Sequence, residues 1–523
     1  MRRIEISENG VNIAFGTDGR NRTGLLHLSA LPFDERALGG RDDFGAFPLF
    51  ELQTSENAPE PSFVFADYRD SLDACGRLIT IVQKDEALSL TAETVFRFFS
   101  GLPAVQVYTR VTNGGAALGA SFLSGFCMTF AACPVMYVVD PASEHVCRPC
   151  DTDTHGISMG MLRSRETGAC LVWQQDGMKM NGSLVNACGM HRLRLSASPA
   201  AGTLDSGGSI TSDVCTLAAA APEKGFEGAF ETLTRLRRIS PKVRRSHDLR
   251  DMPVLFDSGS CPAEDLPRLA EAAGNSGCRY FIVSADSLTA ELSEVIRKNR
   301  MLPAVRLDIS GADAEAIRSS LSLLPKTNLL YLTGCPSPMP GDIIELLSEG
   351  ERIITADAPL ACADIPCALW AVEERYAACA RLAVLPEQLL VRCEIPGNGT
   401  PEQTAAALNR GMLSRICVCG RLDRLSPESF AVVKERLSVY KGLRTDIREG
   451  IPLLVPPLPS ESAGADAAGI RSQDGTRAYL SAAGSPSVSC HSCAAGNEKK
   501  RAPTSEAYQR GELCHDLLSV FGR

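Results

Sequence analysis

The stretch that decides the fold runs from residue 388 to residue 419 and reads QLLVRCEIPGNGTPEQTAAALNRGMLSRICVC. Its two ends are apolar runs of strand length. Between them, Thr400-Pro401-Glu402-Gln403 combines an N-cap residue, a proline at the first helical position and a capping-box glutamine. A strand, a helix and a second strand in this order indicate two parallel strands joined by a crossover helix.

The same pattern recurs from about residue 250 to about residue 440. Eight short apolar runs alternate there with stretches suited to helices, namely Pro253–Phe256, Arg279–Val283, Ala304–Ile309, Asn328–Leu332, Arg352–Thr355, Cys367–Val372, Gln388–Glu394 and Arg415–Cys419. Eight strand–helix units predict a (β/α)8 barrel of the TIM type. The barrel would be compact, because about 190 residues are fewer than the roughly 250 usual for this fold. So little chain separates the fifth run from the sixth that this unit would hold little or no helix.

The chain on both sides of this region is typical of β structure. Short alternating segments punctuated by Gly, Asn, Asp and Pro extend from the start to about residue 240. After residue 446 prolines break the helical pattern, and a short strand-like segment follows. We therefore predict a multidomain β plus α/β protein: an N-terminal β-supersandwich over residues 1–245, a central compact (β/α)8 barrel over residues 246–445 and a small C-terminal β-sandwich over residues 446–523.

The amino-acid composition limits the classes of protein to which this chain can belong. The 523 residues are 44% apolar and 22% charged, as in ordinary globular proteins. The formal charge is −9 and the basic residues do not gather into a stripe, so we expect no nucleic-acid partner. No stretch reaches the roughly 18 apolar residues of a spanning helix, and the N-terminus lacks the apolar core of a secretory signal. We predict a cytoplasmic protein without a membrane partner, with most of its 20 cysteines buried and reduced.

Two cysteine clusters have the spacing of zinc ligands. One is Cys147-x-x-Cys150 with His145 and His155 nearby, and the other is Cys-His-Ser-Cys at residues 490–493. Paired short spacings also arise by chance in a chain with 20 cysteines. No phosphate-binding loop, nucleophile elbow or His-Glu-x-x-His motif occurs. We predict no metal and no cofactor.

The most specific motif lies where the chain leaves the predicted barrel. Gly420 and Asp423 lead into a helix that we expect to end in Tyr440-Lys441-Gly442-Leu443-Arg444. This segment resembles the Tyr-Lys-x-x-Arg motif of the α-galactosidases (melibiases) of glycoside hydrolase family 36. The order of β-sandwich, barrel and small β domain is similar to theirs, and residues 168–173 resemble the family's Gly-x-x-x-x-Trp segment. The chain is thus identified as resembling this family in strongly diverged form.

The resemblance implies retaining hydrolysis, which uses two carboxylates about 5 to 5.5 Å apart. The family places its nucleophile after the fourth strand, in Lys-Trp-Asp, and its acid/base after the sixth, in Trp-x-Ser-Asp. Residues 330–335 of this chain, at the fourth run, read Leu-Tyr-Leu-Thr-Gly-Cys and contain no carboxylate. The sixth run keeps Trp370 and has Glu373 at the acid/base spacing. The resemblance thus implies Glu373 as acid/base and leaves the nucleophile position vacant.

Other polar residues remain at the carboxyl ends of the predicted strands, where barrel enzymes carry their active sites. Asp308 and Asp357, near the ends of the third and fifth runs, flank the vacant position and are candidates for a relocated carboxylate. The expected substrate-binding residues are Asp257, Asp286, Trp370 and Glu394. The alternative for each carboxylate is a solvated rim residue, because barrel rims are polar where loops begin.

Two functions therefore stay open. One is retaining hydrolysis of α-galactosides, which Trp370 and Glu373 favour. The other is a catalytically inactive relative that binds carbohydrate or serves as a structural subunit, which the missing fourth-strand aspartate favours. We expect an α-galactoside-like carbohydrate as the partner, and the resemblance also suggests a homo-oligomer.

Overall fold

The computed structural model describes residues 3–33, 48–55, 58–130, 135–139, 153–175, 182–187, 190–239, 251–323, 329–335, 339–348, 353–356, 368–373, 376–453, 467–482 and 489–492. The described residues up to Leu236 form one compact unit, and those from Arg237 onward form a second. The division falls inside α1 (Gly225–Ile239), slightly before the predicted boundary at residue 245. The finer division into three domains stays a prediction.

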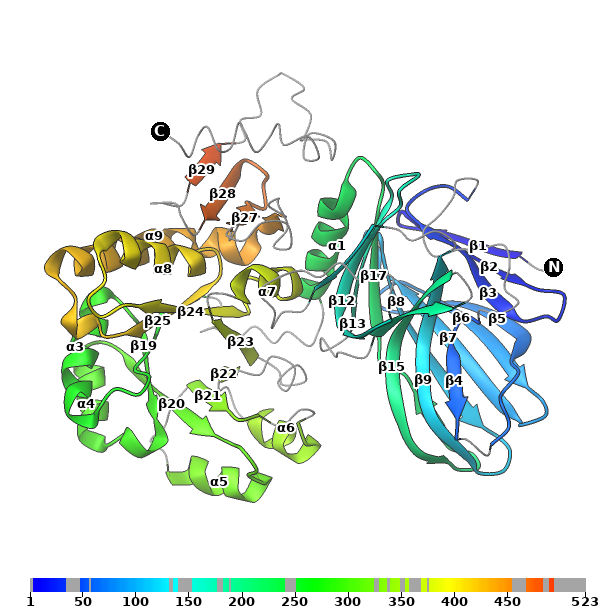
Figure 1. Ribbon diagram of the computed structural model, residues 1–523, viewed down its shortest axis with the longest axis horizontal. Helices are drawn as coiled ribbons and strands as arrows, with labels where there is room; N and C mark the ends of the chain where they lie inside the picture. Colours follow the sequence, from blue (N-terminus) through cyan, green and yellow to red (C-terminus); the bar gives the residue numbers. More distant parts are fainter. Residues whose placement is uncertain are drawn as a thin grey trace. The chain divides into compact units, whose positions relative to one another are not determined.

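The first unit is built from antiparallel strands, which group into three sheets among its described residues (Figure 1). The smallest sheet has the order β1-β2-β3, with bounds Arg3–Glu8, Val11–Thr17 and Thr23–Ser29. The largest has the order β10-β12-β13-β17-β8-β7-β6-β5, with β16 also paired to β8. The third has the order β11-β14-β15-β9-β4.

The bounds of the other strands of this unit follow in chain order: β4 Glu51–Thr54, β5 Val64–Leu72, β6 Arg77–Asp85, β7 Leu90–Phe98, β8 Ala104–Asn113, β9 Leu118–Phe130, β10 Val135–Val139, β11 Thr154–Ile157, β12 Met159–Arg163, β13 Cys170–Gln175, β14 Gly182–Ala187, β15 Met190–Leu204, β16 Ser209–Thr211 and β17 Cys215–Ala220.

One hydrophobic core joins the three sheets. Its buried side chains come from all of them, because apolar residues alternate along the strands and share one face. Phe96 of β7 lies at the centre, with its ring centroid 4.9 Å from that of Phe15 on β2 and 5.7 Å from that of Phe126 on β9. The alternating pattern seen in the sequence thus does form a β core in which sheets pack face to face.

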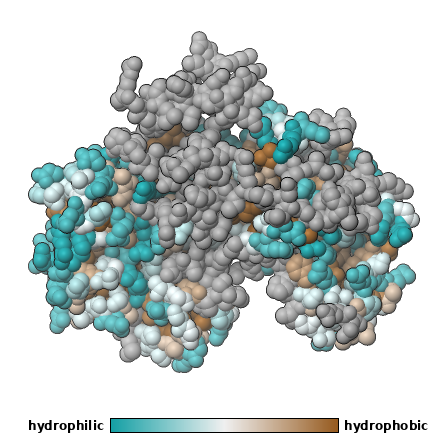
Figure 2. Space-filling model, in the orientation of Figure 1, coloured by the Kyte–Doolittle hydropathy of each residue, from teal (hydrophilic) through white to brown (hydrophobic). Residues whose placement is uncertain are grey.

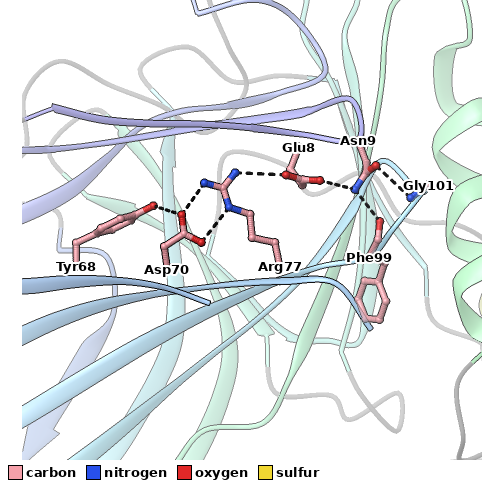
Figure 3. A network of polar contacts seen from close by, with 7 residues as sticks. All are labelled: Glu8, Asn9, Tyr68, Asp70, Arg77, Phe99 and Gly101. Carbon is pink, nitrogen blue, oxygen red and sulfur yellow. Dashed lines mark hydrogen bonds and ion pairs between the residues drawn. The ribbon is translucent and has the colours of Figure 1, made fainter. Parts of the chain in front are cut away.

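A polar network fastens the end of β1 to the large sheet (Figure 3). Arg77 on β6 donates to Asp70 on β5 from Nε (3.1 Å) and Nη2 (2.7 Å), and its Nη1 lies 3.3 Å from Glu8. Asn9, next to Glu8, bonds the backbone of Phe99 and Gly101 in the β7–β8 turn. The bidentate geometry of the Arg77–Asp70 pair makes it the strongest contact of this network.

Replacing Asp70 by asparagine tests the network. Hydrogen bonds from Arg77 hold the pKa of Asp70 below its ordinary value. A carboxylate with a lowered pKa stabilises the folded state above its unfolded pKa and loses that contribution as the pH falls through the folded pKa. The pair is partly exposed, so we expect Asp70→Asn to cost only about 0.5 kcal/mol at pH 7 and less at pH 3, below the unfolded pKa of the carboxyl. Urea unfolding at both pH values measures this.

Asp67→Asn is the matched control, because Asp67 lies on the same strand and its contact with Arg69 is longer, 3.6 Å. An Asp70→Asn effect that stays the same at pH 3 as at pH 7 would show that packing, and not charge, explains it.

The second unit contains a barrel of parallel strands that closes through pairing of its first and last members. The strands follow one another around the ring as β18 Leu255–Asp257, β19 Tyr280–Ser284, β20 Leu302–Asp308, β21 Leu329–Thr333, β22 Ile353–Ala356, β23 Ala368–Glu373, β24 Leu389–Ile395 and β25 Arg415–Gly420. Each lies within two residues of an apolar run in the sequence. The predicted α/β region with a TIM-like sheet is therefore confirmed.

Helices follow most of the barrel strands along the chain (Figure 1). Their bounds are α3 Leu266–Ser276, α4 Ala290–Lys298, α5 Ala314–Leu323, α6 Gly341–Ser348, α7 Ala377–Ala383, α8 Pro401–Gly411 and α9 Pro427–Glu449. The capping box at Thr400 and Gln403 forms as predicted, and Ser426 caps α9. Residues 357–367, which include the connection expected to lack a helix, lie outside the described residues.

The Tyr-Lys-x-x-Arg motif lies within α9 and not at its end as predicted, because the helix continues to Glu449. The tyrosine and arginine side chains of the motif bind the segment just before the first barrel strand. The buried Tyr440 hydroxyl donates to the carbonyl of Met252 (3.3 Å), and Arg444 Nη1 donates to that of Asp251 (2.6 Å). The motif thus fixes the last helix to the entry of the barrel, which is a structural role.

After α9 the described residues form a small antiparallel sheet of the order β26-β27-β28-β29, with bounds Ile451–Leu453, Ala467–Arg471, Arg477–Ala482 and Ser489–Ser492. The hydropathy of the visible face is mixed, with hydrophilic side chains around small hydrophobic areas (Figure 2). Among the helices of the described residues, none combines the length and the apolar character that a bilayer crossing requires.

Candidate active site

Strand alternation decides which side chains reach the inside of the barrel. A buried cluster fills the interior with alternate residues of its strands, among them Leu255, Tyr331, Ala371, Leu390 and Cys417. Two residues further along each strand, at the carboxyl end, the same face carries Asp257, Thr333, Glu373, Arg392 and Cys419. The barrel interior is therefore apolar along the middle of the strands and polar at their carboxyl ends, which form the mouth.

A cavity of about 530 Å³ opens at this mouth. It lies at the carboxyl ends of β18, β20, β21, β24 and β25, the position where barrel enzymes bind their substrates. Its lining residues are Asp257, Ser258, Gly259, Ser260, Cys261, Pro262, Arg306, Tyr331, Thr333, Arg392, Glu394, Cys419, Gly420 and Arg421. The lining is dominated by polar and charged side chains.

Asp257 is the most buried charged group of the cavity, with none of its surface exposed. Its Oδ1 pairs with Arg306 Nη2 and accepts the backbone N–H of Gly259 at 3.0 Å. Its Oδ2 lies 3.2 Å from Arg392 Nη2, close enough for an ion pair although the angle does not make a hydrogen bond. One buried carboxylate thus balances two guanidinium groups.

Arg306 is held in place from three sides. Besides Asp257, its Nη1 donates to the carbonyl of Gly259 (3.1 Å), and its guanidinium lies 5.6 Å from the centre of the Tyr331 ring. Arg421 is fixed by acidic residues outside the lining. It makes a bidentate pair with Asp423 (2.8 and 2.7 Å) and also approaches Asp265 (2.8 Å).

Two thiols on β25 lie beside Arg392. A hydrogen bond from Cys417 holds the pKa of the Cys419 thiol below its ordinary value, against the opposing effect of burial, and the Arg392 charge contributes to the lowering. At the next position, Gly420 adopts φ +104°, and a Cβ there would lie 2.2 Å from the carbonyl oxygen of Ile395. Only glycine lets the chain turn at this side of the cavity.

Asp308 lies beside the place where the resemblance expects a nucleophile. It is the register partner of Thr333 at the end of the fourth strand. A Cβ built on Gly334, the next residue, would lie 2.5 Å from Asp308 Oδ1. The carboxylate is exposed and accepts hydrogen bonds from the hydroxyl (2.7 Å) and N–H (2.9 Å) of Ser310, which lower its pKa. Asp308 is therefore an anion next to the vacant position.

The other predicted residues are placed as follows. Asp257 and Glu394 line the cavity, whereas Asp286, Asp308, Trp370 and Glu373 are not part of its lining. Glu373 ends the sixth strand on the interior face and is exposed. Trp370 alternates with the interior residues Leu369 and Ala371, so it lies on the opposite face of β23 and is mostly buried. Asp357 and its surroundings lie outside the described residues.

Sequence reasoning missed the basic side of the site. Arg306 and Arg392 each lie within a strand, two residues beyond an apolar interior position, where a charge would be costly unless it faced a polar cavity. The sequence signal that could have identified them is a charged residue spaced by two from the apolar residues that face the interior of a predicted strand.

The two cysteine clusters with zinc-like spacing, at residues 145–155 and 490–493, lie partly outside the described residues. The described part of the chain contains no group of three potential metal ligands.

Known proteins resemble this chain in structure but not detectably in sequence. No protein-family model and no curated protein matches it. Among solved structures, the family 36 α-galactosidase AgaA from Geobacillus stearothermophilus has a TM-score of 0.72 at 10% identity, over 92% of this chain and 91% of that one. The galactosidase domain of an α-galactosidase–sucrose kinase, AgaSK, has a TM-score of 0.73 at 12% identity, over 96% and 91%.

A third structure, the α-galactosidase from Lactobacillus brevis, has a TM-score of 0.68 at 9% identity, over 91% of this chain and 88% of that one. Structures of AgaA also exist with bound 1-deoxygalactonojirimycin, raffinose or stachyose. The similarity extends over nearly the whole of both chains, so the resemblance inferred from sequence is confirmed for the architecture. This chain has the fold of the α-galactosidases of glycoside hydrolase family 36, in strongly diverged form.

Proposed function

We propose that this protein is glycoside hydrolase-like and binds an α-galactoside-type carbohydrate in the cavity at the barrel mouth. The observation that carries the proposal is the cavity itself, at the carboxyl ends of the strands of an α-galactosidase fold. Its volume of about 530 Å³ is within the range of roughly 300 to 1,000 Å³ typical of small-ligand pockets. Its lining supplies carboxylates, guanidinium groups and hydroxyls, which are the groups that hydrogen-bond sugar hydroxyls.

Hydrolysis by a retaining mechanism is the second candidate, and it would use two carboxylates at the carboxyl ends of the third and sixth strands, outside the cavity lining. Asp308 lies as an anion beside the vacant nucleophile position, and Glu373 ends the sixth strand on the interior face. In this mechanism Asp308 would attack the anomeric carbon while Glu373 protonates the leaving oxygen; water would then release the sugar, activated by Glu373. Asp357, the other candidate for the relocated carboxylate, lies outside the described residues.

Calorimetric titration of the full chain with methyl α-galactoside tests the binding proposal, with methyl α-glucoside as the stereochemical control. We expect saturable binding of the galactoside. Ser260→Trp should abolish it, because Ser260 lines the cavity and is exposed enough to accept a larger side chain. Ser319→Trp, on the exposed surface of α5, is the matched control and should bind normally. Absence of binding by the folded wild-type chain would contradict the proposal.

Release of nitrophenol from an aryl α-galactoside tests the hydrolytic candidate. Asp308→Asn and Glu373→Gln should each reduce turnover by at least about a hundredfold, while leaving galactoside binding in place. Binding without any turnover by the wild-type chain would identify it as a non-catalytic carbohydrate-binding relative.

A further inference from the structure

The cavity contains more basic than acidic side chains. Three arginines, Arg306, Arg392 and Arg421, line it together with two carboxylates, Asp257 and Glu394. Arg421 is already balanced by Asp423 and Asp265, which lie outside the lining. The arginines that bear on the chemical class of the ligand are therefore Arg306 and Arg392, which share the single carboxylate of Asp257.

The three arginines differ in how many ion-pair and hydrogen-bond partners the protein gives to their guanidinium groups. Arg421 has two acidic partners, and Arg306 has Asp257, a carbonyl and an aromatic ring. Arg392 is different. Its acidic contact is Asp257 at 3.2 Å, a carboxylate that Arg306 also uses, and its Nε is buried without a hydrogen-bond partner. About a third of its side chain stays exposed, at 32%.

We propose that the carbohydrate bound in this cavity carries an anionic substituent, a carboxylate or a sulfate ester, and that Arg392 binds it. The inference rests on the proposed function and specifies its ligand. A guanidinium presents paired N–H donors in a planar fork that matches the oxygens of such a group. An anion at this place could also accept the buried Nε–H of Arg392, which has no hydrogen-bond partner, because a buried donor left unpaired is costly.

Glu394 indicates how such a ligand would be oriented. Its carboxylate is exposed and lines the same cavity, two residues beyond Arg392 on β24. It would repel the anionic group and accept hydrogen bonds from sugar hydroxyls. The anionic end therefore belongs deep in the cavity, next to Arg392, and the neutral end belongs at the opening.

Calorimetry with galactose, galacturonate and galactose 6-sulfate tests the inference on the full chain. We expect at least one anionic sugar to bind about tenfold or more tightly than galactose, by a charge-assisted contact that weakens as salt is added. Comparing the affinities of galacturonate and galactose 6-sulfate shows whether the site prefers a planar carboxylate or a sulfate ester. Inorganic sulfate, titrated alone, should bind far more weakly than the anionic sugar.

Three variants in the cavity and one surface control locate the effect. Arg392→Gln should weaken anionic-sugar binding by about ten- to a hundredfold and weaken galactose binding by a much smaller factor. Arg392→Lys, which keeps the charge but loses the fork, should fall between. Glu394→Gln should strengthen binding of the anionic sugar, and Arg318→Gln, on the exposed surface of α5, should change nothing. Circular dichroism confirms that each variant is folded.

The outcomes separate the inference from the proposed function. Equal affinity for galactose and both anionic sugars overturns the inference and leaves carbohydrate binding standing. Inorganic sulfate that binds as tightly as the anionic sugars also overturns it, because the site would then recognise only the anion. A folded chain that binds none of the three sugars contradicts the proposed function itself.

Discussion

Asp257→Asn is expected to lower the free energy of unfolding of the barrel unit by about 3 kcal/mol, the cost of removing one member of a buried ion pair. Asp257 is fully buried and faces Arg306 and Arg392. Without its charge, two guanidinium groups would lie close together with no counter-ion. Asparagine has nearly the same shape as aspartate, so the loss in free energy of unfolding measures the contribution of the charge and not that of packing. Urea unfolding monitored by circular dichroism measures it.

Two variants control this result. Asp308→Asn removes a carboxylate from the neighbouring rim, but Asp308 is exposed and accepts its hydrogen bonds from Ser310, so its loss should cost much less than that of Asp257. Arg306→Gln should cost less than Asp257→Asn, because Arg392 would still balance the carboxylate. If Asp257→Asn is as stable as the wild type, the ion-pair account of the cavity is wrong.

Trp173→Ala should have the largest effect in the N-terminal unit, a loss of about 4 kcal/mol, as for other large-to-small changes of a buried aromatic residue. Trp173 on β13 is fully buried and belongs to the core that joins the sheets. Its indole packs directly on Gly160 of β12, where a Cβ would lie 2.1 Å from the ring. Thermal and urea unfolding of the full chain should show the loss in the transition of this unit.

The contact with Gly160 supplies the control. Gly160→Ala alone should destabilise by about 2 kcal/mol through overpacking, and less in a Trp173→Phe background, because the smaller ring leaves room for the methyl group. Tyr108→Ala, which removes a half-buried aromatic residue of the same sheet, should cost clearly less than Trp173→Ala. Equal losses for the two aromatic residues would contradict the packing described.

The sequence allowed the barrel to be predicted because its strands are buried on both faces. Such strands read as continuous apolar runs, as at residues 280–283 and 389–391, and their ends lie where polar residues resume. Local signals also sufficed for the start of α8, where the cap needs only Thr400 and Gln403. The predicted end of α9 was wrong, because Gly442 does not interrupt the helix, which continues to Glu449, and the motif residues bind neighbouring segments from within it.

The candidate site was harder to predict because it depends on contacts between distant strands. Asp257 could be named from its position at a strand end, but its partners Arg306 and Arg392 lie far along the chain. Only closure of the ring brings them together. The placement of Trp370 depends on the phase of β23, which a short apolar run does not reveal, because both of its faces are buried.

The central claim, that a carbohydrate occupies the barrel-mouth cavity, can be tested most directly with the protein's own cysteines. Cys261 lines the cavity and is partly exposed, whereas Cys75 is exposed in the N-terminal unit. Burial raises the pKa of Cys261, so the reaction with iodoacetamide should be run at mildly alkaline pH and followed at each cysteine by mass spectrometry. We predict that a saturating galactoside or anionic galactoside slows alkylation of Cys261 and leaves that of Cys75 unchanged; unchanged alkylation of Cys261 under saturating ligand would contradict the account.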